Sequence, residues 1–253
     1  MPYDKCFVYT TISGYKSDTT QILNINTKNI TIELEKDDSY IPLAEDYIVL
    51  NSISSLTGNV ESNKIGAYID TGVSVNQNSI KIESSFKVGD INETTISGDT
   101  DIFGCAAPSV YNGLRLWYEW SKTQTTLNIQ SGLSTHNSKP FFELLTTTNA
   151  NKNDITIEAI NDHPLSIILN GNKITSNGSA NLNYNGTILL MASRVGNSIY
   201  TGKLTLYSTK IYVDNVLVRD YIPVRSKINN KIGLMDLVEN KFYGSVNGES
   251  FTY

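Results

Sequence analysis

The sequence predicts an all-β protein built as an antiparallel β-sandwich, and three observations lead to this prediction. Ile, Thr and Tyr number 28, 25 and 15, whereas only 8 Ala are present. β-Branched and aromatic side chains favour strands, and Ala favours helices. Apolar residues recur at every second position in many short segments, which is the period of a half-buried strand. Turn-forming residues separate these segments at spacings of about ten residues, as in a sandwich or jelly roll.

Each expected strand has one apolar and one polar face. In one segment Ile80 and Ile82 alternate with Lys81 and Glu83, and Phe86 continues the apolar face. Antiparallel strands with one buried and one wet face show this pattern. The same alternation occurs in the segments 30–34, 114–120, 155–159 and 204–213.

Two dipeptides are expected to form tight hairpins. Asn170-Gly171 lies between two apolar segments, and an Asn-Gly pair in that setting is the strongest local hairpin signal. Asp214-Asn215 interrupts a second pair of apolar segments. Both pairs are therefore predicted to join neighbouring antiparallel strands.

A change in composition near residue 45 divides the chain. Residues 1–45 contain two or three short predicted strands, followed by the charged stretch 35–38 and Pro42. So short a segment cannot bury a core of its own. We expect an N-terminal anchoring or assembly segment over residues 1–45, which packs on the main domain or gains its core from another chain. One sandwich domain is expected over residues 46–253.

Charge and hydropathy exclude several classes of function. The formal net charge is −5 and no run of Lys or Arg occurs, so a nucleic-acid-binding surface is not expected. Apolar runs are far shorter than the roughly 20 residues that span a bilayer, so membrane insertion is not expected. The N-terminus has no apolar segment typical of a secretory signal. The two cysteines, Cys6 and Cys105, match neither a disulfide framework nor a zinc site.

Several ordered motifs resemble a known family. The segments 46–52 (DYIVLNS) and 67–73 (AYIDTGV) are similar to the opening of a bacterial and bacteriophage group of concanavalin-A-like (laminin-G-like) jelly-roll domains. The segments 217–225 (LVRDYIPVR), 233–236 (GLMD) and 241–244 (KFYG) are similar to its ending. The resemblance covers residues 46–253 and implies a jelly-roll fold. Members of the group are parts of phage tails and fibres, adhesins and bacterial surface proteins, and some relatives bind or cleave polysaccharide.

One charged residue in these motifs invites two interpretations. Arg219 lies among apolar neighbours, so its charge needs a partner. It is expected to pair with Asp220 or Asp236 and join the last strands. The alternative is a ligand-binding arginine.

No catalytic constellation is evident. Glycosidases need two carboxylates that flank the scissile bond. Glu33 and Glu35, like Asp99 and Asp101, are spaced to share a strand face, but a solvated edge or turn explains both pairs.

The remaining candidates for chemistry are expected to be structural. His136 and His163 lie in loop-like stretches, and Cys105 is expected to be a small buried core residue. The sequence therefore predicts no catalytic residue, no metal site and no cofactor, and a protein that is not an enzyme. The alternative is a calcium ion bound by loop oxygens, either of Asp90, Asp99 and Asp101 or of Asn161 and Asp162, at spacings that are not diagnostic.

The best ligand candidate is an aromatic face with polar neighbours, since sugar rings stack on aromatic side chains and their hydroxyls form hydrogen bonds. Trp117, with Arg115 and Glu119, alternates with the apolar face of its strand, and Tyr111 and Tyr200 lie in nearby turn-like stretches. These residues form the predicted glycan-binding set. The alternative is that this face is covered, and that Trp117 serves packing.

The sequence and the resemblance together lead to a functional expectation. We expect a non-enzymatic bacteriophage virion structural protein, a head or tail fibre or a decoration protein, that adheres to host surface glycans. It would assemble in the host cytoplasm and attach to other virion proteins through residues 1–45. A homotrimer is expected by analogy with fibres. The alternative is a carbohydrate-binding module of a bacterial or phage surface protein, and an endo-acting glycosidase comes third.

Overall fold

The chain divides into two compact units, Met1–Tyr47 and Ile48–Tyr253. The computed structural model describes residues 6–10, 18–22, 46–55, 65–88, 97–108, 112–121, 125–131, 141–144 and 152–253. In the first unit, β1 (Cys6–Thr10) pairs antiparallel with β2 (Asp18–Ile22). The strand expected at 30–34 lies outside the described residues. No helix within the described ranges is long and apolar enough to cross a membrane.

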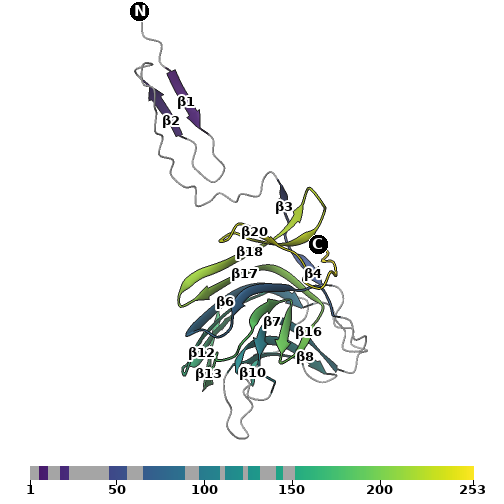
Figure 1. Ribbon diagram of the computed structural model, residues 1–253. Helices are drawn as coiled ribbons and strands as arrows, with labels where there is room; N and C mark the ends of the chain where they lie inside the picture. Colours follow the sequence, from purple (N-terminus) through teal and green to yellow (C-terminus); the bar gives the residue numbers. More distant parts are fainter. Residues whose placement is uncertain are drawn as a thin grey trace, which may run out of the picture. The chain divides into compact units, whose positions relative to one another are not determined.

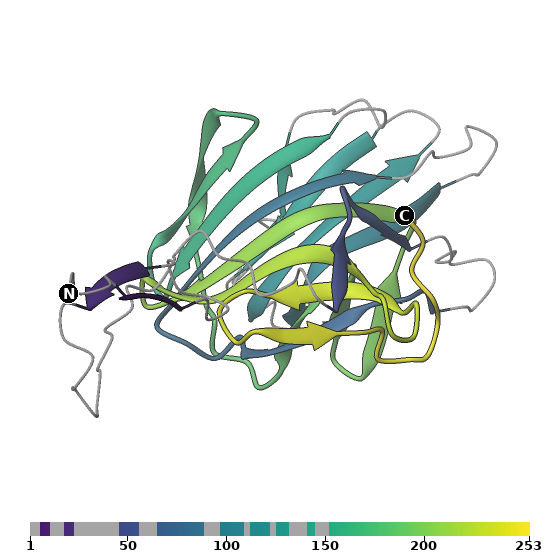
Figure 2. The ribbon, with the colours of Figure 1, turned by 90° about the horizontal axis from the view of Figure 1, so that it is seen from above.

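The second unit is a sandwich of two sheets (Figures 1 and 2). The ten-stranded sheet contains β3 (Tyr47–Val49), β4 (Ile53–Ser55), β6 (Ser79–Val88), β11 (Asn153–Ile160), β12 (Pro164–Leu169), β13 (Asn172–Ser179), β17 (Leu204–Val213), β18 (Val216–Ser226), β19 (Ile232–Asp236) and β20 (Lys241–Tyr243). The eight-stranded sheet contains β5 (Ile69–Ser74), β7 (Ser97–Ala106), β8 (Gly113–Ser121), β9 (Thr125–Gln130), β10 (Phe141–Leu144), β14 (Thr187–Leu190), β15 (Ala192–Val195) and β16 (Ser198–Thr201).

The chain passes repeatedly from one sheet to the other. β5 belongs to the eight-stranded sheet, β6 to the ten-stranded sheet, and β7 to the eight-stranded sheet again. β13 and β14 also lie in different sheets. The longest paired strands are antiparallel, among them β6 with β17 and β7 with β8. The predicted all-β antiparallel sandwich is therefore confirmed.

The core lies between the sheets and uses the predicted apolar faces. Ile80, Ile82 and Phe86 of β6 are fully buried. Leu114, Leu116 and Tyr118 of β8 are buried in the same core cluster, although they belong to the other sheet. The alternation read from the sequence therefore assigns the inward faces of both sheets correctly.

Both predicted hairpins are present. Asn170 and Gly171, with φ values of 50° and 81°, join β12 to β13. Asp214 and Asn215, with φ values of 48° and 66°, join β17 to β18. Two consecutive residues with positive φ give a turn whose twist matches that of the flanking strands.

Arg219 joins the last strands, as one of its two interpretations predicts. Its Nε lies 3.5 Å from Asp236 Oδ2, and its Nη1 lies 2.7 Å from Glu239 Oε1. Nε also donates to the Thr71 carbonyl oxygen at 3.1 Å. Asp220 pairs instead with Lys210, at 3.3 Å. The arginine is thus bound to groups of its own chain.

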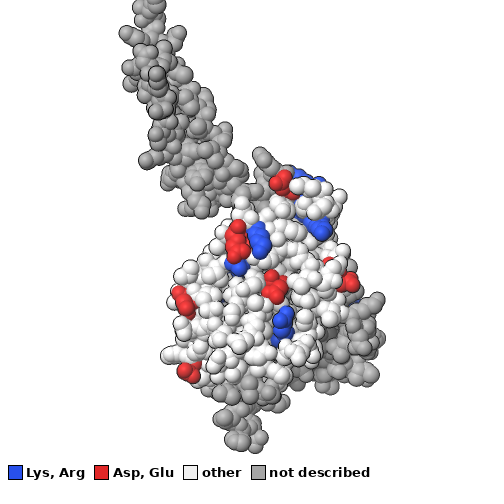
Figure 3. Space-filling model, in the orientation of Figure 1, with Lys and Arg blue, Asp and Glu red and all other residues white. Residues whose placement is uncertain are grey.

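Charged side chains are sparse on the face of the molecule shown in Figure 3, and basic ones lie close to acidic ones. Among the described residues, Lys81 Nζ lies 2.8 Å from Glu83 Oε1. Within the described part of that face, positive charge does not gather into a patch.

Candidate functional site

The structure brings together three of the five residues in the predicted glycan-binding set. Arg115 and Trp117 lie on β8, and the Arg115 guanidinium carbon is 4.4 Å from the centre of the Trp117 ring. Tyr200 of β16 approaches the same guanidinium, with its ring centre at 5.3 Å. Tyr111 lies outside the described residues, as does the side chain of Glu119.

Arg115 belongs to an ion pair, and Trp117 and Tyr200 lie beside its guanidinium. Arg115 Nε and Nη2 donate to the two carboxylate oxygens of Asp101, at 2.6 and 3.1 Å. The Ser193 hydroxyl also donates to Asp101. Burial raises the pKa of the Asp101 carboxyl, while the Arg115 guanidinium and the Ser193 hydroxyl act to lower it.

The expectation that the Asp99/Asp101 pair lies at a solvated edge or turn is therefore wrong for Asp101. This residue is fully buried within β7, where it lies opposite Trp117 of β8. The β7–β8 pairing shifts its register between Asp101 and Phe103, and Asp101, Ile102 and Phe103 are all buried there. The side chain of Asp99 lies outside the described residues.

Trp117 is covered by its own chain. Only 5% of its surface is exposed, whereas Tyr200 is 42% exposed. A ring so deeply covered offers no free face for a sugar. The alternative interpretation of Trp117, packing, thus agrees with its burial, and glycan binding by this set stays an untested prediction.

Two other sequence interpretations agree with the structure. Cys105 is fully buried, and burial raises the pKa of its thiol to about 11. His163 is exposed in the turn that follows β11. The Glu33/Glu35 pair and His136 lie outside the described residues. Within the described ranges, no group of three or more His, Cys, Asp or Glu is placed to hold a metal ion.

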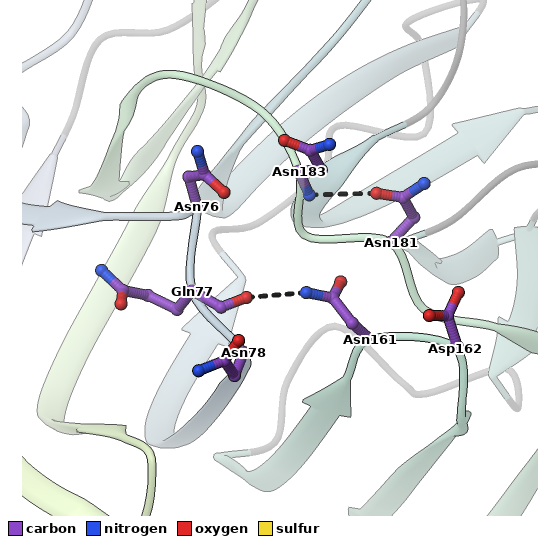
Figure 4. Close-up of a pocket in the computed structure, with 7 residues that line it drawn as sticks. All are labelled: Asn76, Gln77, Asn78, Asn161, Asp162, Asn181 and Asn183. Atoms are coloured by element: carbon purple, nitrogen blue, oxygen red, sulfur yellow. Dashed lines mark hydrogen bonds between the residues drawn. The ribbon is translucent and has the colours of Figure 1, made fainter.

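A pocket that the sequence analysis missed opens at one end of the sandwich (Figure 4). Its volume is about 500 Å³, and every residue that lines it is Asn, Gln or Asp. The lining residues come from three connections, β5 to β6, β11 to β12 and β13 to β14. They are Asn76, Gln77, Asn78, Asn161, Asp162, Asn181 and Asn183.

Asn161 holds the three connections together. Its Nδ2 donates to the Gln77 carbonyl oxygen at 2.8 Å, and its Oδ1 accepts from the Leu182 backbone N at 2.7 Å. Its own backbone N donates to the Asn78 carbonyl oxygen at 3.1 Å. Both ends of this side chain are occupied, so Asn161 positions the pocket. Figure 4 shows its bond to Gln77.

The remaining lining side chains divide into two groups. Asn181 Oδ1 accepts from the Asn183 backbone N at 3.0 Å, and Asn76 Nδ2 donates to Asn185 Oδ1 at 3.3 Å. The side-chain polar groups of Gln77, Asn78, Asn183 and Asp162 make no hydrogen bond to another described residue. The second group is therefore available to a ligand.

A smaller hollow of about 280 Å³ lies on the ten-stranded sheet. Three serines, Ser84, Ser85 and Ser208, line it together with Asp154 and Ile168. Ser85 Oγ already donates to Asp154 Oδ1, at 2.5 Å. Fewer of its polar side chains lack a hydrogen-bond partner than in the Asn-lined pocket. This hollow therefore serves as a comparison site for the pocket.

The sequence contains a signal for the pocket, although its local pattern indicates only turns and, at Asn161 and Asp162, possible calcium ligands. Asn76-Gln77-Asn78, Asn161-Asp162 and Asn181-Leu182-Asn183 each place amide or carboxylate side chains next to one another. Such clusters are common in turns, where Asn and Asp bond to the local backbone. Only the order of the strands shows that the three clusters meet.

No protein-family model matches the sequence, and no curated protein matches it. Similar solved structures include scytalido-glutamic peptidase with a peptide-based transition state analog. It is 13% identical over 72% of this chain and 91% of that chain, with a TM-score of 0.36. Another is SCP-B, a member of the Eqolisin family of peptidases, in a complex with the tripeptide Ala-Ile-His. It is 13% identical over 72% of this chain and 90% of that chain, with a TM-score of 0.34.

These similarities overturn one expectation. The sequence predicts a protein that is not an enzyme, whereas the similar solved structures are peptidases, so that expectation is not retained. At 13% identity and TM-scores of 0.36 and 0.34, the similarity transfers no catalytic residue and no substrate to this chain. What the pocket binds must follow from its own chemistry.

Proposed function

We propose that the sandwich domain binds a glycan in the Asn-lined pocket. The observation that carries this proposal is the lining itself, in which all seven residues are Asn, Gln or Asp. An amide offers both a donor and an acceptor, and a sugar hydroxyl requires both. The pocket volume of about 500 Å³ falls within the range typical of small-molecule sites.

The construction of the pocket supports binding. Asn161 uses its whole side chain to hold the three connections, which leaves the Gln77, Asn78 and Asn183 amides in fixed surroundings. Polar groups held in place before binding lose less conformational entropy when a ligand arrives. A hydroxyl-rich ligand therefore finds several uncommitted polar side chains on loops whose backbones are held together by Asn161.

We also propose a biological setting, a bacteriophage head or tail fibre or decoration protein. The resemblance of the motifs in residues 46–253 supports it, and residues 1–45 would attach the protein to other virion proteins. A homotrimer assembled in the host cytoplasm is the proposed form. The second setting is a carbohydrate-binding module of a bacterial or phage surface protein. Genes for capsid or tail proteins beside this gene favour the first setting, and light scattering of the purified chain measures the oligomeric state.

The binding proposal is tested with the purified full chain on a glycan array, followed by calorimetry with the bound glycan. Asn78→Ala and Asn183→Ala should each weaken binding about three- to tenfold, since a hydrogen bond contributes roughly 0.5–1.5 kcal/mol. Asn172→Ala is the matched control, because Asn172 is an exposed asparagine at the opposite end of β12 and β13 from the pocket. Binding that survives both pocket variants, or no binding to any glycan, would refute the proposal. Loss of binding in Ile168→Ala, with binding retained in the pocket variants, would place the ligand in the smaller hollow.

A further inference from the structure

Charge in the Asn-lined pocket is confined to one residue. Asp162 is the single acidic side chain among the lining residues, and the lining contains no Lys, Arg or His. No described cation forms an ion pair with Asp162. The pocket therefore presents one uncompensated negative charge beside neutral amides.

We infer that the pocket selects neutral glycans over acidic ones and that Asp162 is the residue that discriminates between them. The inference rests on the proposed glycan-binding function. A ligand carboxylate, sulfate or phosphate would meet a like charge, and no described cation pairs with Asp162 to offset it. A neutral hydroxyl, in contrast, can donate to the Asp162 carboxylate, and hydrogen bonds to a charged acceptor are about twice as strong as neutral ones.

The backbone fixes the position of Asp162. Its N donates to the Ala180 carbonyl oxygen at 3.0 Å, and the next residue, His163, donates from its N to the Ile160 carbonyl oxygen at 3.0 Å. The Ala180 backbone N in turn donates to the His163 carbonyl oxygen at 2.8 Å. These bonds hold the turn against the chain that enters β14, so the backbone of Asp162 has a defined place at the pocket.

The carboxylate is free to accept from a ligand. The residue is exposed, and its side chain makes no hydrogen bond to another described residue. A carboxylate has two oxygens and only accepts, so it can bind two adjacent hydroxyls of one sugar ring. The amides of Asn78 and Asn183 supply the donors that the remaining ring oxygens need.

The backbone conformation at Asp162 indicates which conservative substitution preserves the turn. Asp162 has a φ of 64°, in the left-handed region that Asn and Asp adopt more readily than other non-glycine residues. Asp162→Asn therefore keeps the turn and the size of the side chain while it removes the charge. Asp154→Asn is the matched control, since Asp154 lies at the opposite end of β11 and lines the smaller hollow.

The test uses pairs of oligosaccharides that share linkages and differ by one acidic group, such as a neutral hexose oligomer and its uronate or sulfated counterpart. Calorimetry at low salt should show the wild-type chain binding the neutral member at least tenfold more tightly. Higher salt should reduce this preference, because ions screen exposed charges. Asp162→Asn should bring the two affinities to within about threefold, and Asp154→Asn should leave the preference unchanged. Thermal melts check that the variants are folded.

Each outcome decides a different point. Equal binding of both members by the wild type, or a preference unchanged in Asp162→Asn, overturns the role of Asp162 while the glycan-binding function stands. A preference for the acidic member overturns the inference as well. Failure of the wild type to bind any member of the panel, or of the wider array, overturns both the inference and the proposed function.

Discussion

Arg115 and Asp101 form a two-point ion pair that joins β8 to β7, with donor to acceptor distances of 2.6 and 3.1 Å. The carboxylate is fully buried and the arginine side chain is 12% exposed. Ser193 of β15 donates a third bond to the same carboxylate, and the Trp117 ring covers the guanidinium. Arg115 and Trp117, two of the residues that indicate a ligand face in the sequence, thus belong to a contact between neighbouring strands of one sheet.

Removing one member of this ion pair should be costly. Asp101→Ala leaves the Arg115 charge largely buried without its partner, which typically costs about 3–5 kcal/mol of the free energy of unfolding. Urea denaturation measures the loss. The matched control is Glu249→Ala, an exposed carboxylate whose side chain makes no hydrogen bond or ion pair to another described residue, which should change stability by less than about 0.5 kcal/mol. A loss below about 1 kcal/mol in Asp101→Ala would contradict this prediction, because it would mean that water can replace the carboxylate as the partner of Arg115.

Trp117 should behave as a packing residue. Since its side chain is 5% exposed, Trp117→Ala leaves a cavity and should cost about 3–5 kcal/mol. For a domain of this size that corresponds to a fall of roughly 6–20 °C in melting temperature. Tyr200→Ala, at a position 42% exposed, should have a much smaller effect. A Trp117 variant that melts like the wild type would restore this face as a ligand candidate.

The fold could be predicted because its signals are local. Alternation in β6 assigns Ile80 and Ile82 to the core, and both are fully buried. Side chains on a strand alternate strictly, so a short sequence decides which face is buried. The Asn170-Gly171 hairpin is equally local, since two residues set its turn.

The sites could not be predicted because they depend on residues far apart in the sequence. Asp101 is buried only because β7 lies between β8 and β14, with Ser193 brought to it by β15. The Asn-lined pocket likewise needs Asn161, Gln77 and Leu182 to meet, although 84 residues separate the first pair and 21 the second. Local patterns identify each turn, and only the order of strands brings the turns together.

The β12–β13 hairpin should depend on Gly171. Its φ is 81°, where a side chain is strained, although no atom lies within 4 Å of an added Cβ. Gly171→Ala should therefore cost about 1–2 kcal/mol through the backbone alone. Gly244→Ala is the control, since Gly244 lacks a positive φ and an added Cβ would meet Phe242 at an ordinary 3.5 Å. Equal stability of the two variants in urea would contradict the strained conformation.

Stability should fall at alkaline pH in part because of Cys105. Burial raises the pKa of its thiol from 9.0 to about 11. Between these two values the unfolded chain loses the thiol proton while the folded chain keeps it. The folded state therefore binds more protons, and stability decreases as pH rises through this window. Two pKa units correspond to a contribution of about 2–3 kcal/mol.

The contribution of Cys105 can be isolated by comparison with Cys105→Ala, which lacks the thiol and retains every other titrating group. Urea denaturation at several pH values from 8 to 11 should give a steeper loss of stability in the wild type than in the variant. Parallel curves for the two chains would contradict the raised pKa. The buried thiol should also react slowly with a thiol reagent at neutral pH while the domain is folded.

The boundary near residue 45 leads to a final prediction. All members of the core cluster lie between Ile53 and Phe251, so a chain of residues 46–253 retains the entire described core. This truncated chain should be soluble and unfold cooperatively, with a urea midpoint close to that of the full chain. Residues 1–45 should instead be needed for assembly, so the truncated chain should lose the oligomeric state of the full chain.

A chain that starts at residue 57 is the control, because it lacks the fully buried Ile53 and the strand β4 that pairs with β17. It should be several kcal/mol less stable, as expected when a buried side chain and its strand pairing are lost. An insoluble or non-cooperative 46–253 chain would show that the first 45 residues belong to the core.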